Sequence, residues 1–123
     1  MIILDHTAVL ALCHGHRFLA GLVVIEAGDL QQRAHVPALC LVAASQELPG
    51  ATAHVGALSG LEFLPLDFAA CAAVEEAAAS GIEWSCAHAV YAAVSEADGG
   101  QVLTAAPQAY DGTGVWAVDI GAP

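Results

Sequence analysis

The hydrophobic and polar positions of the chain form short apolar runs that alternate with longer stretches of helical periodicity. The apolar runs are bounded by turn residues and predict β-strands at residues 1–5, 35–37, 61–66, 101–104 and 115–120. The periodic stretches predict helices at residues 8–13, 16–27, 38–47, 51–58, 68–79 and 84–97. Strands separated by helices indicate βαβ units, so the pattern predicts a three-layer α/β domain with a mostly parallel central sheet flanked by helices.

Capping residues and glycines set the expected helix boundaries. Thr7 is a suitable N-cap for the first helix and Asp67 for the helix that follows residues 61–66. Gly28 and Gly81 are expected to end their helices, since glycine commonly follows the last helical residue. No linker interrupts this order, so residues 1–123 are expected to form a single domain.

The composition argues against a membrane protein and against a disulfide framework. Hydrophobic residues make up 58% of the chain, yet the longest pure apolar stretches, such as residues 38–44, are much shorter than a membrane span of roughly 20 residues. The cysteines Cys13, Cys40, Cys71 and Cys86 lack the close spacing of a zinc motif. They are therefore expected to be buried free thiols of a protein in the reducing cytoplasm.

The charge of the chain disfavours nucleic-acid binding. Thirteen acidic residues against two basic ones give a formal net charge of −11. Proteins that hold nucleic acid neutralise several phosphates with Lys and Arg, and Arg17 and Arg33 alone cannot build such a surface. The expected partner is a second copy of the chain or another protein.

Several segments, taken in their order along the chain, resemble the PIN-domain family. Residues 4–10 resemble the opening motif, an aspartate after the first strand with Ser or Thr two positions on. Residues 36–44 resemble the strand and helix that carry the second acid, and residues 87–93 and 99–107 the later helix, glycine, strand and T-x-D segment. The resemblance covers essentially the whole chain and implies a PIN-like fold. Small proteins of this kind that keep their acids resemble bacterial toxins of toxin–antitoxin pairs, which are magnesium-dependent ribonucleases.

The family's metal-binding acids are incompletely represented in this chain. Asp5 matches the first acid, whereas Ala43, His88 and Ala106 occupy the positions of the other three. Mg²⁺ binds through carboxylates, waters and substrate phosphates, and imidazole suits Zn, Cu, Fe or Ni better. The residual site therefore consists of Asp5, Thr7, His88 and Thr104, with no cofactor expected.

Two other ways of binding a metal at this site stay open, one through carboxylates elsewhere in the chain and one through His88. Glu47, one helical turn after Ala43, is the weak second candidate for a Mg²⁺ or Mn²⁺ ligand beside Asp5, and Glu83 could also be recruited. His88 could bind a transition metal or act as a general base with Asp5 and His6. The favoured interpretation is that it fills the vacated pocket and hydrogen-bonds to Asp5, since zinc sites need three or four protein ligands.

Other residues are interpreted as structural. His14 and His16 flank Gly15 in a turn and are expected to be solvated. Cys86 is expected in the core. Phe18, Leu22 and Ile25 share one helical stripe, which indicates a core-facing side or an oligomer seam.

The sequence therefore favours a catalytically degenerate PIN-like protein that acts through protein–protein contacts, as a homodimer or with another protein. The alternative is a Mg²⁺- or Mn²⁺-dependent ribonuclease, the toxin of a toxin–antitoxin pair, that uses Asp5 and relocated carboxylates. A third hypothesis is a decoy subunit that dimerises with an active PIN homologue. Enzymatic activity stays open, and a non-catalytic role is preferred.

Overall fold

The central sheet contains five strands, all paired in parallel, in a computed structural model that describes residues 1–26 and 33–121. The strand order is β3-β2-β1-β4-β5, and the four pairings are each parallel. The strands are β1 (Ile2–Leu4), β2 (Ala34–Pro37), β3 (Leu61–Leu64), β4 (Gln101–Thr104) and β5 (Trp116–Asp119). This sheet confirms the mostly parallel arrangement that the hydrophobic pattern predicts.

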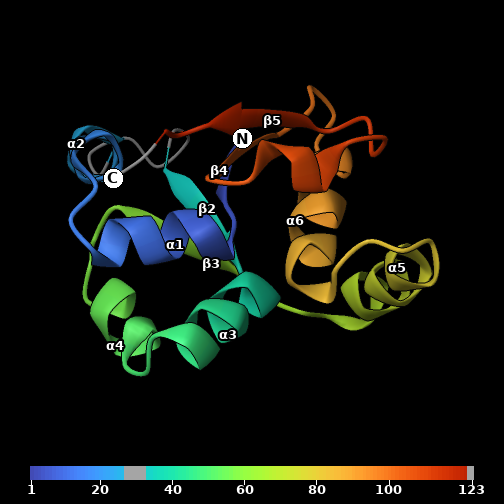
Figure 1. The fold of residues 1–123 in the computed structure, drawn as a ribbon, viewed down its shortest axis with the longest axis horizontal. Helices are drawn as coiled ribbons and strands as arrows, with labels where there is room; N and C mark the ends of the chain where they lie inside the picture. The colour runs from blue at the N-terminus through green and yellow to red at the C-terminus, as the bar shows by residue number, and fades with distance from the viewer. Residues whose placement is uncertain (27–32, 122–123) are drawn as a thin grey trace.

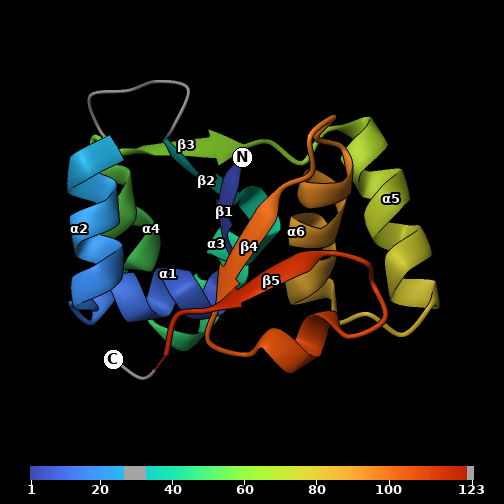
Figure 2. The same ribbon diagram turned by 90° about the horizontal axis from the view of Figure 1, so that it is seen from above.

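Helices cover both faces of the sheet and complete a three-layer fold. They are α1 (His6–Cys13), α2 (Arg17–Glu26), α3 (Ala38–Glu47), α4 (Ala51–Gly56), α5 (Phe68–Ala79), α6 (Trp84–Val94) and the 3₁₀ helix η1 (Pro107–Tyr110). Figures 1 and 2 show α1, α2 and α4 on one side, with α5 and α6 on the other. Helix α3 packs against both α1 and α6 near the carboxyl ends of the strands.

The central strands send alternate side chains into two separate core clusters. Ile3 and Val102 lie side by side in register and pack under α6, whereas Leu4 and Leu103 pack under α1 and α2. Both faces of a parallel sheet are buried in this way, which explains why its strands are uninterrupted apolar runs.

Gly100 allows β4 to start close to α6. A Cβ atom at this position would lie 2.9 Å from Ala93 Cα and 3.1 Å from Ile3 Cδ1. Such contacts are too tight for a side chain, so packing requires glycine at position 100, whereas the preceding Gly99, with a φ of 76°, makes the turn.

The first helix starts earlier than predicted because Asp5, and not Thr7, is its N-cap. The Asp5 carboxylate accepts a hydrogen bond from Ala8 N, and the helix begins at His6. Thr7 lies in the first turn of α1, and its Oγ1 donates a hydrogen bond to the capping carboxylate of Asp5. Asp67 caps α5 as predicted and accepts a hydrogen bond from Ala70 N at 2.9 Å.

Other boundaries differ by a few residues. Helix α6 ends at Val94 instead of residue 97, α4 ends at Gly56 instead of residue 58, and the 3₁₀ helix η1 follows β4 without a signal in the hydrophobic pattern. The expected helix end at Gly28 lies outside the described residues.

His16 is buried, which contradicts its interpretation as a solvated loop residue. Its Nδ1 accepts a hydrogen bond from Leu19 N at the start of α2, and its Nε2 lies 3.1 Å from the carbonyl oxygen of Ile120. With Nδ1 as acceptor, Nε2 carries the proton and donates to that carbonyl. His16 therefore joins the start of α2 to the chain that follows β5.

Burial of the cysteines and of the α2 stripe is more varied than predicted. All four cysteines are free, with Cys40 and Cys86 buried, Cys13 half-buried and Cys71 exposed on α5. Of the predicted α2 stripe, Phe18 is 56% exposed and Leu22 is half-buried against the core, while the Ile25 side chain lies outside the described part of the structure. The core-facing residues of α2 are instead Leu19 and Val23, so the stripe was assigned to the wrong face of the helix.

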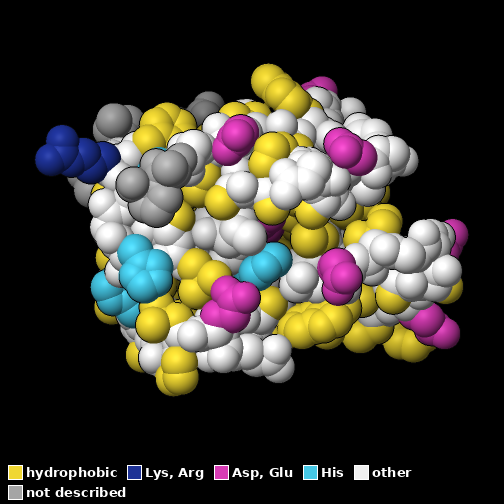
Figure 3. Space-filling model, in the orientation of Figure 1, with side chains coloured by type: hydrophobic (Ala, Val, Ile, Leu, Met, Phe, Trp, Pro, Cys, Tyr) yellow, Lys and Arg dark blue, Asp and Glu magenta, His cyan; other side chains and the backbone are white. Residues whose placement is uncertain are grey.

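The surface carries scattered acidic groups and very little positive charge. On the face in Figure 3, acidic side chains are spread over the surface and Lys or Arg is visible at one edge. Arg33, one of two basic residues in the sequence, forms an ion pair of 2.8 Å with Glu62 on β3. Among the described helices, none has the length and apolar content required to cross a bilayer.

Candidate functional site

Asp5 follows β1 at the carboxyl edge of the sheet and is only 1% exposed. Its Oδ1 accepts from Thr7 Oγ1 at 2.6 Å and from Ala8 N at 3.0 Å. Its Oδ2 accepts from the Tyr110 hydroxyl at 2.8 Å. An ionised carboxylate has about four acceptor positions, so three protein hydrogen bonds leave one free.

Thr7 and Thr104 connect this carboxylate to the end of β4. Thr7 Oγ1 donates its proton to Asp5 and accepts from Ala105 N at 2.8 Å. Its single proton is therefore used, so Thr104 Oγ1 must be the donor across the 3.2 Å between the two hydroxyls. Thr104 Oγ1 also accepts from Ala106 N at 3.0 Å. Three of the predicted site residues thus form one hydrogen-bonded chain across the tips of β1 and β4.

Tyr110 also belongs to this site, although the sequence did not predict it. It lies at the end of η1, is 3% exposed and directs its hydroxyl at Asp5. Burial raises the pKa of this hydroxyl, and the neighbouring Asp5 carboxylate raises it further. Tyr110 therefore stays protonated and donates to Asp5. The only signal was its position shortly after the T-x-D segment, and neither spacing nor residue type identifies such a contact.

His88 is buried on α6 but contacts other groups than the predicted Asp5. Its Nδ1 accepts from Leu39 N at 3.3 Å at the start of α3, and its ring stacks on Tyr91 with centroids 6.5 Å apart. Burial lowers the pKa of the imidazole, while the Asp67 carboxylate and the Pro65 carbonyl oppose this effect. The favoured hydrogen bond from His88 to Asp5 is not formed, and His88 shares no group of three metal-ligating side chains with Asp5 among the described residues.

The other positions of the family's acids offer no carboxylate. Ala43 is buried on α3 and Ala106 is half-buried after β4. Glu47 and Glu83 are both exposed, at the end of α3 and immediately before α6. Within the described residues, neither glutamate joins a group of three metal-ligating side chains.

A different group of potential ligands surrounds Asp5. Ligand atoms of Asp5, His6 and Cys86 all lie within 4.8 Å of one another. Cys86 comes from the first turn of α6 and is 3% exposed, in agreement with its expected place in the core. Burial raises the pKa of its thiol, and a hydrogen bond with Tyr110 acts in the opposite direction. The sequence predicted only a core position for Cys86, because its proximity to Asp5 depends on how α6 packs on β1.

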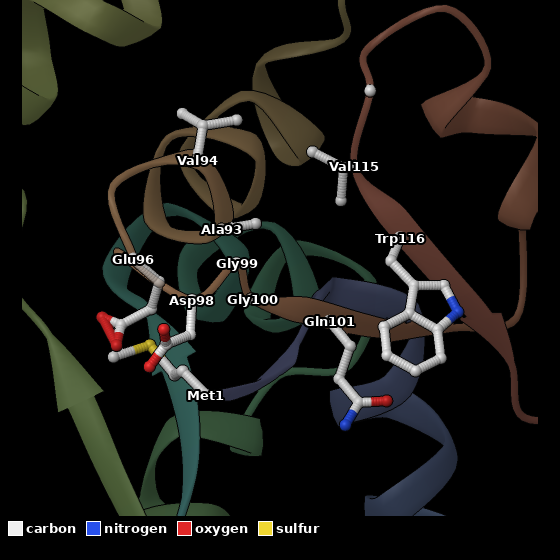
Figure 4. Close-up of a pocket in the computed structure, with 11 residues that line it drawn as sticks. Met1, Ala93, Val94, Glu96, Asp98, Gly99, Gly100, Gln101, Val115 and Trp116 are labelled. Atoms are coloured by element: carbon white, nitrogen blue, oxygen red, sulfur yellow. The ribbon is translucent and has the colours of Figure 1, made fainter.

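A pocket lies at the opposite edge of the sheet from Asp5. It has a volume of about 360 Å³ and is lined at the amino ends of three strands by Met1, Gln101 and Trp116. Figure 4 shows the Glu96 and Asp98 carboxylates on one side of this pocket and the Trp116 indole on the other. In parallel α/β sheets, ligands bind at the carboxyl ends of the strands, so the Asp5 cluster is the stronger candidate.

The sheet order, the helical layers and the polar strand tip define an α/β domain of the PIN-like kind. The chain is similar to one in the crystal structure of DNA-bound VapBC from Salmonella typhimurium, with a TM-score of 0.66, 17% sequence identity and 98% of each chain covered. At this identity the likeness establishes the fold, and it confirms the PIN-like fold predicted from the sequence. No protein-family model and no curated protein matches the sequence.

Proposed function

We propose that this protein is a catalytically degenerate PIN-like protein that acts through protein–protein contacts in the cytoplasm. The observation that carries the proposal is the state of Asp5, which is 1% exposed and hydrogen-bonded through both carboxylate oxygens. A catalytic Mg²⁺ keeps several waters and contacts substrate phosphates, so its ligands must face an open, hydrated space. Asp5 serves instead as a buried helix cap.

The remaining positions support the same proposal. The side chains of Ala43 and Ala106 provide no oxygen ligand, and His88 Nδ1 already accepts a hydrogen bond from Leu39 N. With a net charge of −11, the chain would also repel a phosphate backbone. These features favour a binding role over nuclease chemistry.

Exposed apolar side chains support a role in protein contacts. Phe68 at the start of α5 is 89% exposed and Trp116 on the edge strand β5 is 69% exposed. Large exposed aromatic side chains are typical of contact surfaces, where they contribute much of the binding energy. VapBC is itself a complex of a PIN-domain toxin and an antitoxin, which supports a protein partner for a chain of this fold. We propose a homodimer as the simplest assembly.

Calorimetric titration of Mn²⁺ into the wild type and Asp5→Asn tests the degenerate site, because Mn²⁺ prefers the same oxygen ligands as Mg²⁺. We expect that the wild type shows no saturable binding of Mn²⁺ at Asp5, so that its titration and that of Asp5→Asn give the same result. Sedimentation equilibrium over a range of concentrations tests the assembly, and a dimer is expected. Binding of Mn²⁺ that disappears in Asp5→Asn would contradict the degenerate site, and a monomer at every concentration would contradict the homodimer.

The second candidate function is a Mg²⁺- or Mn²⁺-dependent ribonuclease. It is favoured by the convergence of Asp5, Thr7 and Thr104 at the carboxyl edge of the sheet, where a catalytic site of this fold class would lie. Glu47 or Glu83 would have to move to supply the missing charge. This candidate predicts metal-dependent cleavage of RNA that Asp5→Asn abolishes and that Asp67→Asn, at an equivalent helix cap, leaves intact.

A further inference from the structure

Three side chains that can bind a soft or borderline metal meet where β1 ends and α6 begins. Asp5 and His6 are consecutive at the start of α1, and Cys86 lies in the first turn of α6. One ligand atom of each lies within 4.8 Å of the others. Within the described part of the chain, no other group of three or more His, Cys, Asp or Glu side chains has ligand atoms this close together.

The chemistry of the three donors selects the ion. A carboxylate, an imidazole and a thiol together suit Zn²⁺, whereas Mg²⁺ and Mn²⁺ favour oxygen ligands. Bond lengths of about 2.0–2.3 Å in a tetrahedral zinc site place ligand atoms roughly 3.3–3.8 Å apart. Closure from separations of at most 4.8 Å therefore requires movements of up to about 1 Å, which fall to His6 and Cys86 because three hydrogen bonds hold Asp5 in place.

A separate observation concerns His6 Nδ1, a buried nitrogen without a hydrogen-bond partner among the described residues. A buried polar atom left unpaired costs about 1–3 kcal/mol, and such an atom in a folded protein requires an explanation such as a bound ion. The His6 side chain as a whole is half-buried, so of the three candidate ligands it is the one nearest to solvent by exposure.

The hydrogen bonds of Asp5 suit a metal ligand that is held in place. Thr7, Ala8 and Tyr110 donate to the carboxylate and fix its orientation, and one acceptor position stays free. Groups that hydrogen-bond to a ligating carboxylate in this way orient it and tune its affinity for the ion.

We propose that Asp5, His6 and Cys86 form a zinc-binding site with three protein ligands and a fourth position open to water or to a partner's side chain. Cys86 loses its thiol proton to solvent when the ion binds. The neighbouring buried thiol of Cys40 donates to the Ser85 carbonyl at 3.4 Å and stays outside the ligand set. The site differs from the Mg²⁺ site of a PIN nuclease in its ion and in two of its three ligands.

Zinc titration into metal-free protein, in competition with a chromophoric chelator, tests the proposal. We expect one Zn²⁺ per chain in the wild type and a loss of at least about 100-fold in affinity in Cys86→Ser and in His6→Gln. Cys71→Ser removes an exposed thiol on α5 and is expected to bind zinc like the wild type. Circular dichroism of each variant confirms that the fold is retained.

Two further measurements separate this site from other modes of binding. Co²⁺ in place of Zn²⁺ is expected to give a thiolate charge-transfer band in the wild type that is missing in Cys86→Ser. Zn²⁺ is expected to raise Tm in the wild type and in Cys71→Ser, since an ion that binds only the folded state stabilises it. The half-buried His6 provides a variant that keeps its fold even if Cys86→Ser unfolds. No zinc binding by the wild type, or equal binding by His6→Gln, overturns the proposal.

Discussion

The Tyr110 hydroxyl donates a 2.8 Å hydrogen bond to Asp5 Oδ2, although the two residues are 105 positions apart in the chain. This contact connects η1, which follows β4, to the helix cap that follows β1. It takes up one of the acceptor positions of Asp5 Oδ2 and leaves another free. The bond therefore stabilises the fold and limits the chemistry that Asp5 can perform.

Asp5→Ala is expected to destabilise the protein much more than Asp67→Ala. Both aspartates cap a helix with nearly the same backbone angles, φ −81° and ψ −177° for Asp5 and φ −80° and ψ −176° for Asp67. Asp67 is exposed, so its loss is expected to cost about 1 kcal/mol. Loss of Asp5 also removes the acceptor of the half-buried Thr7 hydroxyl and of the buried Tyr110 hydroxyl, for a total of about 3 kcal/mol. Urea denaturation measures both values, and equal losses would refute a special role for the buried cap.

Tyr110→Phe isolates the hydroxyl that contacts Asp5. The substitution leaves the ring in the core and removes one donor to a buried carboxylate, so we expect a loss of about 1–2 kcal/mol in the free energy of unfolding. Tyr91→Phe is the matched control, because the Tyr91 hydroxyl has no hydrogen bond within the described residues. It is expected to be nearly neutral, and a similar effect of both substitutions would argue against the bond.

The stability of the protein is expected to fall in mild acid because of His88. Burial lowers the pKa of its imidazole below the ordinary value of 6.5, so the unfolded chain takes up this proton at a higher pH than the folded chain. The stability that neutral His88 contributes is fully present above the pKa of this imidazole in the unfolded chain. It is lost as the pH falls through the lower pKa of the folded protein. His88→Asn keeps an acceptor for Leu39 N but cannot titrate, so its Tm should decline less between pH 7.5 and pH 5.

The exposed histidine His54 on α4 provides the control for this pH dependence. His54→Asn is expected to follow the wild type over the same range. Parallel curves for the wild type and His88→Asn would show that other groups cause the acid sensitivity.

The cysteines are expected to react at very different rates with a thiol-specific reagent. Cys71 is exposed, whereas Cys40 and Cys86 are buried and burial raises the pKa of both thiols, which suppresses the reactive thiolate. A disulfide-exchange reagent should label Cys71 rapidly in the native protein and the two buried thiols only on unfolding. Cys71→Ser should remove the fast phase, and rapid labelling of Cys86 in that variant would indicate that the site opens.

Gly100→Ala is expected to destabilise the contact between β4 and α6. The added Cβ would meet the Ala93 backbone at 2.9 Å, a clash that requires the strand or the helix to shift and costs about 1–3 kcal/mol. Gly56→Ala, at the end of α4, has no heavy atom within 4 Å of its added Cβ and is expected to be neutral or slightly stabilising. Thermal unfolding of the two variants tests the difference, and a neutral Gly100→Ala would mean that the contact is loose.

The elements and their order were predictable because they depend on local patterns. Strands buried on both faces are short apolar runs, as in β1 and β4, and helices start at capping residues such as Asp67. The error at Thr7 arose because Asp and Thr are both good caps, and only the backbone conformation at Asp5 distinguishes them.

By itself the sequence determined the α/β class, the parallel sheet and the carboxylate at the tip of β1, because periodicity and capping act over a few neighbouring residues. Only the tertiary structure decided which groups surround that carboxylate. Tyr110 and Cys86 reach Asp5 through the packing of η1 and α6, and His88 is directed to Leu39 instead. Such contacts join segments far apart in the chain, and no local pattern records the angle at which two elements pack.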